Sequence, residues 1–368
     1  MTKEEIIKMQ ISRVEKEIRD TPYHKATEHH HGILRAKLSK LKDQLDKSGQ
    51  KGGGGGIGYA IKHSGDASIV LVGLPSVGKS TLLNKLTNAE SKIGNYDFTT
   101  LGVVPGMMEY KGVRIQILDL PGIIEGASGN KGFGKKVLSV VRASDLVVLM
   151  ADIKRINWLK KVENELYNSG IRLNIEPPKI TVRKMYKGAI QVVDPYKSFS
   201  NEVVVGVAKE MGFSNAVIQF EEKINNIDRL VDALSKSRKY MSGIEVISKI
   251  DTVSEKKVKE ILKKKNENLV LMSAEKGLGI DEFKEKIWQG LGLVRIFLKR
   301  ERNSNVDKKE PLIIKKDSSL DDVLKIISNQ MRDDVNRAYI WGDKARFPGQ
   351  EVSFKFKVFD EIEVYFGR

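Results

Sequence analysis

Residues 73–80 read GLPSVGKS and carry the strongest chemical signal in the sequence. Two glycines separated by four residues and followed by lysine and serine form the pattern of a phosphate-binding loop. An apolar run precedes the loop and a helical stretch follows it. We therefore expect its backbone amides and the positive end of that helix to face phosphate groups. The residues predicted to contact phosphate are Gly73, Leu74, Pro75, Ser76, Val77, Gly78, Lys79, Ser80 and Thr81.

Residues further along the chain are predicted to complete the phosphate end of the site. Lys79 is expected to bridge the terminal phosphates, and the hydroxyl of Ser80 is expected to ligate Mg²⁺. Asp119 and Gly122 bound a DLPG sequence at the end of an apolar run, where the carboxylate can hold a metal-bound water and the amide can meet the γ-phosphate. Thr100 is predicted to reach Mg²⁺ when a triphosphate is bound, the alternative being a plain turn threonine. The predicted catalytic residues are thus Lys79, Thr100 and Gly122, and the predicted metal ligands are Ser80, Thr100 and Asp119.

Two short elements near the second half of the chain are predicted to hold a purine base. Ser248, Lys249 and Asp251 belong to an SKID sequence that closes one apolar run, and Ser273 and Ala274 close the next. If both runs are strands of the sheet that carries the phosphate loop, these residues lie at the same sheet edge. A carboxylate at 251 can accept from the ring N–H and the exocyclic amine of guanine, whereas adenine offers neither donor there. Guanine is therefore favoured over adenine.

Short β-branched runs alternate with helical stretches and indicate an α/β fold with a mainly parallel sheet. The expected strands are 68–72, 113–118, 146–151, 244–248 and 268–272. The stretch between the third and fourth strands is too long for a single crossover helix, so it is predicted to contain an inserted domain. Within it, the pattern predicts a strand pair over residues 179–186 and 189–193 and helices over residues 201–211 and 226–237.

Both ends of the chain carry further modules. Thr2 and Glu5 have capping-box spacing, and two apolar stripes, one through residues 7–18 and one through 34–45, predict a helical hairpin. The C-terminal pattern of strand, strand, helix and three strands suggests a β-grasp module. The predicted division is a hairpin at 1–50, a glycine-rich linker at 51–66, a core domain at 67–152 and 241–293, an inserted α+β domain at 153–240 and a β-grasp domain at 294–368.

Composition places the chain among globular proteins and excludes several classes of site. Of its 368 residues 40% are hydrophobic and 30% charged, and there is no cysteine, which excludes disulfides, thiolate metal sites and a cysteine nucleophile. The longest apolar stretches fall short of the roughly 18 residues needed to span a bilayer, and no secretory signal pattern is present, so we expect a cytoplasmic protein without a membrane partner. The net charge of +16 favours polyanionic partners, with the largest excess, +6, in 153–240.

The motifs together resemble the developmentally regulated GTP-binding protein family, a branch of the Obg-related GTPases of archaea and eukaryotes. The resemblance rests on GLPSVGKST, YDFTTLGVVPG, DLPGIIEGA, SKID and SA, and continues through KATEHHHGILRAKLSKLKDQL, NELYNSGIRLNIEPPKI, IWQGLGLVRIFLK and AYIWGDKARFPGQ, so it covers essentially the whole chain. It implies a P-loop GTPase domain with a helical N-terminal region, an inserted ribosomal-protein-like domain and a C-terminal TGS domain. It also implies association with translating ribosomes and with a stabilising partner protein.

Three positions bear on how the resemblance applies. The family's base-recognition motif normally begins with Asn, which contacts the base and ties the strand end to the phosphate loop, whereas Ser248 is shorter and has no amide donor. Ile123 follows Gly122 where Ras-like enzymes place a water-orienting Gln, so we expect slow intrinsic turnover, at or below roughly 10⁻² s⁻¹. Related enzymes often bind K⁺ through a loop Asn, here Ser76, which leaves potassium dependence open.

The sequence therefore predicts a Mg²⁺-dependent GTPase that binds GTP and GDP and acts as a slow switch on ribosomes or RNA, with switch segments at 94–105 and 119–136. Two alternatives stay open: an ATPase on the same scaffold, and a ribosome-binding scaffold in which nucleotide is a structural ligand. The histidines at 24 and 29–31 are expected to lie on a solvated helix face. The sequence does not determine the oligomeric state, the RNA or the partner protein.

Overall fold

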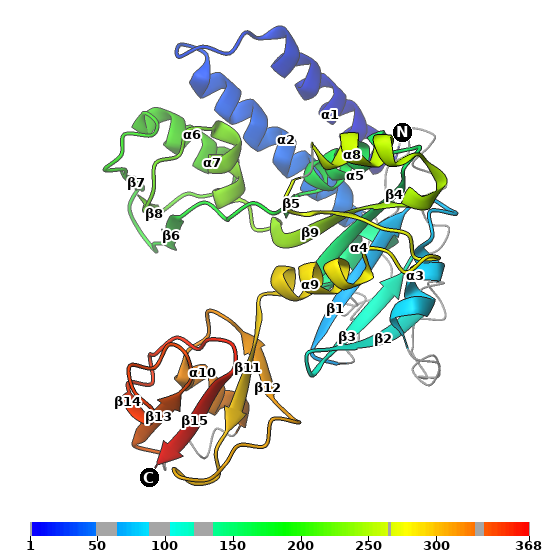
Figure 1. Cartoon of the computed structure of the whole chain (residues 1–368). Coiled ribbons are helices and arrows are strands. Elements are labelled where there is room, and N and C mark those ends of the chain that lie inside the picture. Colours follow the sequence, from blue (N-terminus) through cyan, green and yellow to red (C-terminus); the bar gives the residue numbers. More distant parts are fainter. Residues whose placement is uncertain are drawn as a thin grey trace. The chain divides into compact units, whose positions relative to one another are not determined.

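Figure 1 shows a computed structural model of the chain, which describes residues 2–48, 65–87, 104–120, 135–263, 266–327 and 335–367. The chain divides into two compact units. One consists of residues 1–58 and 164–241, and the other of residues 59–163 and 242–368. No helix in the described ranges is both long enough and apolar enough to cross a membrane.

The second unit contains a sheet whose strands run in the order β10-β9-β4-β1-β3-β2. Its strands are β1 (Ala67–Gly73), β2 (Val104–Tyr110), β3 (Val113–Asp119), β4 (Leu146–Asp152), β9 (Lys239–Ser248) and β10 (Leu269–Leu271). All neighbours pair in parallel except β2, which is antiparallel to β3. Every residue of β1 and β4 is buried, as expected for strands covered on both faces. The mainly parallel sheet is confirmed, whereas β2 is a strand that the sequence pattern does not predict.

Helices complete the core around this sheet. They are α3 (Lys79–Leu86), α4 (Lys135–Ala143), α5 (Asn157–Asn168), α8 (Glu255–Leu262) and α9 (Ile280–Leu291), with a short 3₁₀ helix at Ile250–Thr252. Leu82 of α3 and Phe283 of α9 are completely buried and belong to one hydrophobic cluster with the strand residues. Apolar burial thus fixes the start of α3 against the end of β1, which is where the phosphate loop lies.

The C-terminal module is a mixed sheet with one helix. Its elements are β11 (Leu293–Leu298), β12 (Leu312–Lys315), α10 (Leu320–Ile327), β13 (Arg337–Trp341), β14 (Gln350–Val352) and β15 (Ile362–Gly367). The strands run in the order β12-β11-β15-β13-β14, and α10 buries Leu320 and Val323 in their cluster. This is the succession of elements predicted for residues 294–368, and its assignment as a TGS domain stays a prediction.

The first unit begins with the predicted helical hairpin, α1 (Lys3–Asp20) and α2 (Glu28–Ser48). The capping box is confirmed, because the Thr2 amide donates to a Glu5 carboxylate oxygen at 2.7 Å and the Glu5 amide donates to Thr2 Oγ1 at 3.3 Å. Ile7 and Val14 of α1 pack with Leu34 and Leu41 of α2 in one cluster. Figure 1 shows the two helices lying side by side.

The predicted strand pair in the insert is wrong in its pairing. The insert contains β5 (Ile171–Leu173), β6 (Ile180–Lys184), β7 (Ile190–Val193), α6 (Asn201–Glu210), β8 (Ala216–Phe220) and α7 (Ile227–Leu234). β6 and β7 do not pair with each other, because β8 lies between them, antiparallel to β6 and parallel to β7. Residues of β8 alternate between buried and half-buried and supply the centre of the sheet.

The N-terminal hairpin packs on the insert, although the sequence analysis treats them as two domains. Ala36 of α2 belongs to the same hydrophobic cluster as α6 and α7, and Arg35 makes a two-pronged contact with Asp228 at 2.6 and 2.5 Å. A Cβ at Gly206 would come within 2.5 Å of the His29 ring, so α6 approaches α2 closely only without a side chain there. The expected solvated histidine face is wrong for His31, which is 2% exposed and lies 3.0 Å from the carbonyl of Thr21 through Nε2.

A buried ion network holds this unit together. Asp232 accepts from Arg172 at 2.7 and 2.8 Å and from Arg238 at 2.6 Å, and Arg238 also donates to Ser39 of α2. The side chains of the three charged residues are at most 10% exposed. Two guanidinium groups therefore share the buried carboxylate of Asp232, and Arg238 also lies 3.6 Å from a carboxylate oxygen of Asp43.

Replacing Asp232 with Ala should lower the free energy of unfolding by about 3–5 kcal/mol, because it removes the buried carboxylate that two buried arginines share. Urea denaturation followed by circular dichroism measures the change. Lys8→Ala, which removes an exposed side chain that pairs with Glu4, is the control and should leave stability unchanged within error. A loss below 1 kcal/mol in the Asp232 variant would contradict this account of the network.

Candidate functional site

The phosphate loop adopts the strand, turn and helix geometry that its sequence predicts. β1 ends at Gly73 and α3 begins at Lys79, with Gly78 as the residue before the helix. A Cβ at Gly73 would come within 2.7 Å of the Met150 carbonyl, so glycine is needed for the loop to start against β4. Gly78 has φ +95° and Ser76 has φ 63°, which places two loop residues in the left-handed region. The first amides of α3 have no partner within the helix and are directed at the loop.

Lys79 is buried inside this loop. Its side-chain ammonium donates to the carbonyls of Gly73 at 2.9 Å and Leu74 at 3.2 Å. Burial lowers the pKa of Lys79, while the negative charge of Asp119 acts in the opposite direction. Lys79 is thus a buried cation, 6% exposed, whose hydrogen bonds go to main-chain oxygens. An anion bound in the loop can replace these oxygens as the partner of the ammonium.

Ser80 and Asp119 meet beside the lysine. The Ser80 hydroxyl donates to Asp119 Oδ2 at 3.0 Å, and Asp119 closes β3 in register with Leu71 of β1. Asp119 is 1% exposed, and its other oxygen, Oδ1, is buried with no hydrogen-bond partner among the described residues. Burial raises the pKa of Asp119, an effect that the charge of Lys79 and the Ser80 hydroxyl oppose. A buried carboxylate oxygen without a donor is suited to meet a cation.

The end of β9 is joined to the phosphate loop through Ser248. Its hydroxyl lies 2.6 Å from the Val77 carbonyl and 3.2 Å from the Ala151 carbonyl of β4, and the residue is 2% exposed. Ser248 therefore ties the strand end to the phosphate loop, although it is shorter than the Asn that normally begins this motif in the family. Its sequence separation from Val77 shows that the link is purely a product of the fold.

The remaining base-end residues lie directly after β9 and β10. Lys249 has φ 59° and turns the chain into the 3₁₀ helix that carries Asp251. A hydrogen bond from the Ser273 hydroxyl is the main cause that lowers the pKa of Asp251, with Lys276 and Lys249 contributing. The Ser273 hydroxyl therefore lies near the Asp251 carboxylate, and Ala274 follows this serine in the sequence.

Most of the sequence-predicted site residues fall at one edge of the sheet, as their strand ends require. The structure links the loop, Asp119 and Ser248 by the contacts above, and places Asp251 beside Ser273. Thr100, Gly122 and Ile123 lie outside the described residues, as do most of the two predicted switch segments. Their expected roles stay predictions.

The sequence analysis missed the pair Asp152 and Arg155. Asp152 ends β4 and accepts from the Arg155 side chain at 2.7 Å, and it lines a cavity of about 540 Å³ with Lys249 and Thr252. Asp152 of β4 lies in register with Ser248 of β9, so both residues end their strands at the same edge of the sheet. That shared position is the signal by which the sequence analysis could have found Asp152. The hydrogen bond to Arg155 lowers the pKa of Asp152 despite burial, which acts in the opposite direction.

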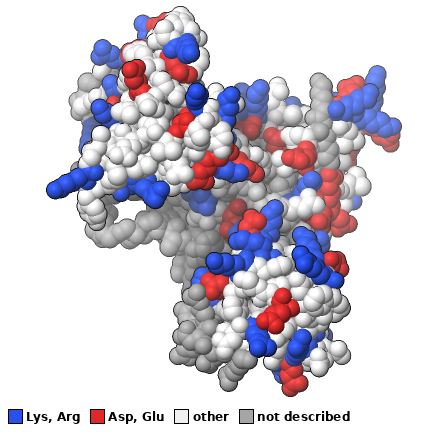
Figure 2. Space-filling model, turned by 90° about the vertical axis from the view of Figure 1, so that its left-hand side faces the viewer, with Lys and Arg blue, Asp and Glu red and all other residues white. Residues whose placement is uncertain are grey.

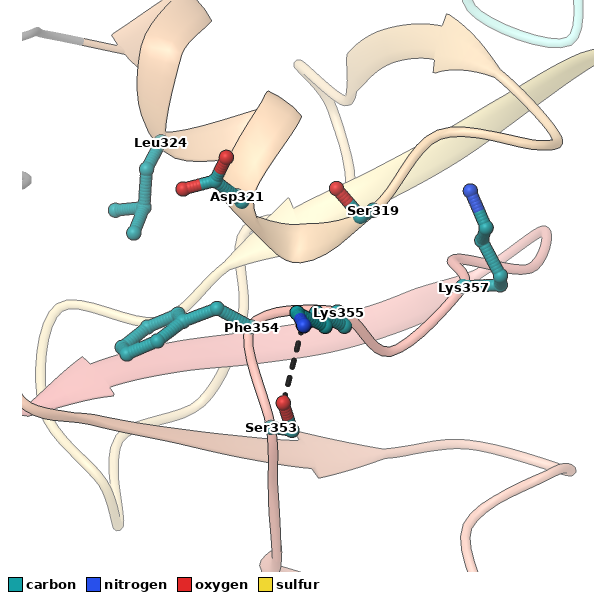
Figure 3. A pocket seen from close by; sticks show the side chains of 7 residues that line it. All are labelled: Ser319, Asp321, Leu324, Ser353, Phe354, Lys355 and Lys357. Carbon is teal, nitrogen blue, oxygen red and sulfur yellow. Dashed lines mark hydrogen bonds between the residues drawn. The ribbon is translucent and has the colours of Figure 1, made fainter.

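A second cavity of about 660 Å³ lies in the C-terminal module and involves none of the predicted site residues. Figure 3 shows Ser319, Asp321 and Leu324 on one side of it, and Phe354 and Lys355 on the other. The amides of Leu320 and Asp321 donate to the carbonyls of Phe356 and Phe354. The start of α10 is therefore already satisfied by protein.

Comparisons with known proteins agree with this geometry. Residues 68–184 match the family described as 50S ribosome-binding GTPase, and residues 187–293 match the C-terminal region of the MMR_HSR1 domain. An uncharacterized GTP-binding protein of Methanocaldococcus jannaschii is 43% identical over 96% of this chain and 91% of the relative. Developmentally-regulated G-protein 3 of Arabidopsis thaliana is 39% identical over 96% of this chain and 97% of the relative. The chain belongs to the developmentally regulated GTP-binding protein family.

This membership confirms the resemblance drawn from the motifs and the P-loop GTPase fold, and it makes the chain a GTP-binding protein. Ribosome-interacting GTPase 1 of Saccharomyces cerevisiae is a further member, 38% identical over 95% of this chain and 96% of the relative.

Replacing Asp119 with Asn should not destabilise the nucleotide-free protein at neutral pH, because the raised pKa shows that the buried charge costs stability there. The folded state holds the proton more tightly than the unfolded state, so the wild-type penalty disappears as pH falls toward the ordinary value of 3.8. The stability difference in favour of Asn should therefore grow as pH rises from about 4 to 7. Urea titrations across that range measure it, and a difference that shrinks with rising pH would be the contrary result.

Proposed function

We propose that this protein hydrolyses GTP to GDP and phosphate at the phosphate loop, as a slow switch. The observation that carries the proposal is the group formed by Lys79, Ser80 and Asp119. A buried ammonium lies at the start of α3 beside a hydroxyl that donates to a carboxylate, and one oxygen of this carboxylate has no partner among the described residues. Such a set neutralises phosphate charge and meets a cation without further rearrangement of the backbone.

The same residues fit a magnesium ion. Mg²⁺ prefers oxygen ligands, and the Ser80 hydroxyl and the carboxylate that it contacts supply them, with Oδ1 of Asp119 unpartnered among the described residues. When bound, Mg²⁺ would neutralise charge on the phosphates. In this proposal Lys79 exchanges its carbonyl partners for phosphate oxygens, Thr100 joins Ser80 and Asp119 at Mg²⁺, and the Gly122 amide contacts the γ-phosphate.

Guanine is the base that Asp251 favours. Its carboxylate is held ionised by the Ser273 hydroxyl, so it presents acceptors only, which match the N–H donors of guanine and not the bare ring nitrogen of adenine. Ile123 in place of a water-orienting side chain supports slow turnover. Ser76 stands at the loop position where related enzymes that bind K⁺ have Asn, so potassium dependence is a separate question that the turnover assay below tests.

Lys79→Ala should abolish GTP turnover while leaving the fold intact, because it removes the one buried cation that the loop holds among the described residues. Lys85→Ala removes an exposed lysine from the same helix and serves as the matched control, with turnover unchanged. Phosphate release under single-turnover conditions, with Mg²⁺ and with and without K⁺, measures both. Undiminished release in the Lys79 variant would defeat the assignment, and no release from the wild type under any condition would favour the scaffold alternative.

We also propose that the protein acts on ribosomes or another structured RNA during translation. Support comes from the yeast relative's name and from the description of the matched family. The surface at the turn between β6 and β7 adds a physical reason. Residues 180–193 include Arg183, Lys184 and Lys187 and no Asp or Glu. All three cations are exposed.

Tyr186 lies among these cations and is 104% exposed, more than any other large hydrophobic side chain in the described ranges. Cations neutralise phosphates, and an exposed ring stacks on an unpaired base. Figure 2 shows one face of the molecule, on which Lys and Arg side chains project among Asp and Glu side chains. The chemistry of this turn suits single-stranded or looped RNA.

The double variant Lys184→Ala, Lys187→Ala should weaken binding to purified ribosomes and reduce the slope of log affinity against log salt by about 1 to 2. Lys209→Ala, Lys223→Ala removes the same charge from other exposed positions of the unit and should change both quantities less. Sedimentation at several salt concentrations provides the affinities. Equal losses in the two variants would show that only net charge matters and that the turn is not the contact.

A further inference from the structure

The cavity of about 660 Å³ in the C-terminal module has walls that the main chain already holds in place. One wall is the start of α10, and the other is the stretch 353–357. The Leu320 amide donates to the Phe356 carbonyl at 3.1 Å, and the Asp321 amide donates to the Phe354 carbonyl at 2.9 Å. Because the protein itself uses these amides, side chains have to recognise a ligand in this cavity.

One end of the cavity is apolar. Leu324 is 1% exposed, and Phe354 is half-buried against the hydrophobic cluster of the module. Figure 3 shows both side chains toward the same end of the cavity, with Asp321 beside them. A flat ring is suited to cover such an apolar surface. The Asp321 carboxylate pairs with Lys325 at 2.9 Å, and because a carboxylate has about four acceptor sites, it can also accept from an exocyclic amine of the ring.

The rest of the cavity carries positive charge. Lys355 and Lys357 are exposed, and the Lys357 ammonium donates to the Asp317 carbonyl at 2.6 Å and keeps further N–H groups for a ligand. The Ser353 hydroxyl accepts from the Lys355 amide at 3.2 Å, which leaves its own hydrogen for a ligand. Within the described ranges neither lysine has an acidic partner at salt-bridge distance. An anion would therefore gain charge-assisted hydrogen bonds here.

These two parts of the cavity match a ligand that is both aromatic and anionic. An anion without a ring would leave the apolar end in water, and a ring without a charge would leave both lysines unpaired. The volume is within the range of small-molecule sites. We infer that the cavity binds a nucleoside monophosphate unit, with its base between Leu324 and Phe354 and its phosphate at Lys355 and Lys357. The cavity shares no residue with the proposed GTP site, so the inference goes beyond the proposed function and does not depend on it.

AMP is the probe, because its amine can face Asp321 and because adenine lacks the donors that the proposed guanine site requires. Equilibrium dialysis of the full-length protein, supplied with Mg²⁺ and one equivalent of GDP, measures the binding of AMP, adenosine and inorganic phosphate. AMP should bind with a Kd below about 1 mM and at least about tenfold more tightly than adenosine or phosphate alone. A weaker AMP affinity, equal affinities for the three probes, or release of GDP by AMP would overturn the inference.

A double lysine variant tests the phosphate contact. Lys355→Ala, Lys357→Ala should weaken AMP binding at least about tenfold, because it removes the charged donors of the cavity. Lys309→Ala, Lys316→Ala removes the same charge from exposed positions of the same module and should leave AMP binding unchanged. Equal losses in the two variants would show that only net charge attracts AMP. Thermal unfolding curves that match the wild type show that each variant is folded.

Phe354→Leu tests the base contact, because it keeps an apolar side chain at this position but removes the ring. AMP binding should weaken about two- to tenfold, and the binding of inorganic phosphate should not change. An AMP affinity that equals that of the wild type would place the base elsewhere and overturn this part of the inference.

A nucleoside monophosphate unit can be a free nucleotide or the end of an RNA, and a 5′-phosphorylated adenosine trinucleotide distinguishes the two. If the trinucleotide binds at least about tenfold more tightly than AMP and loses this affinity in the double lysine variant, the cavity holds an RNA end. If it binds as AMP does or more weakly, the cavity holds a free nucleotide. Binding of either probe that persists in the double lysine variant would overturn the site. A failure of GDP to bind would refute the proposed function, and the AMP titration on the GDP-free protein would still decide the inference.

Discussion

The parallel pairing of β1 with both β3 and β4 is the constraint on which the rest of the site depends. Leu71 of β1 lies in register with Asp119 of β3, and Gly73 lies in register with Met150 of β4. Because the strands are parallel, their carboxyl ends reach the same edge of the sheet. β9 joins the same edge, with Ser248 in register with Asp152. The ends of four strands thus lie at one edge of the sheet, and their residues come together there.

The phosphate loop holds buried charged side chains whose hydrogen bonds are incompletely satisfied among the described residues. Lys79 is held by carbonyls, and Asp119 has one oxygen with a single hydroxyl donor and another with no donor among the described residues. Burial lowers the pKa of Lys79 and raises the pKa of Asp119, which favours the neutral form of each side chain. The network around Asp232 is the opposite case, because its two arginines satisfy both carboxylate oxygens and its role is structural. Buried charge that is incompletely hydrogen-bonded, as at the phosphate loop, is typical of a binding site. Buried charge that is fully paired, as in the insert, is typical of a structural element.

Local patterns were sufficient to predict the local parts of the fold. The glycine spacing gave the phosphate loop, the threonine and glutamate at the N-terminus gave the capping box, and apolar periodicity gave most helices and core strands. Pairing between distant segments was beyond such patterns. β8 enters between β6 and β7 from a later part of the chain, and α2 docks on α6 and α7 through long-range packing. No periodicity encodes which partner a strand or helix will find.

The base end shows the same division. The SKID and SA elements indicate the strand ends, but the length of a side chain alone does not tell whether Ser248 reaches the phosphate loop. Whether a short hydroxyl spans that gap depends on how closely β9 and the loop pack, and the structure puts them 2.6 Å apart through the serine oxygen. His31 is similar, since its burial follows from the turn between two helices and not from its own segment.

The most direct test of the central claim is isothermal titration calorimetry of the Mg²⁺-supplied protein with GDP and, separately, with ADP. The account predicts one GDP site per chain, with an affinity at least about tenfold above that for ADP, because only guanine matches the carboxylate of Asp251. Equal affinities for the two nucleotides, tighter ADP binding, or no heat with GDP would contradict it.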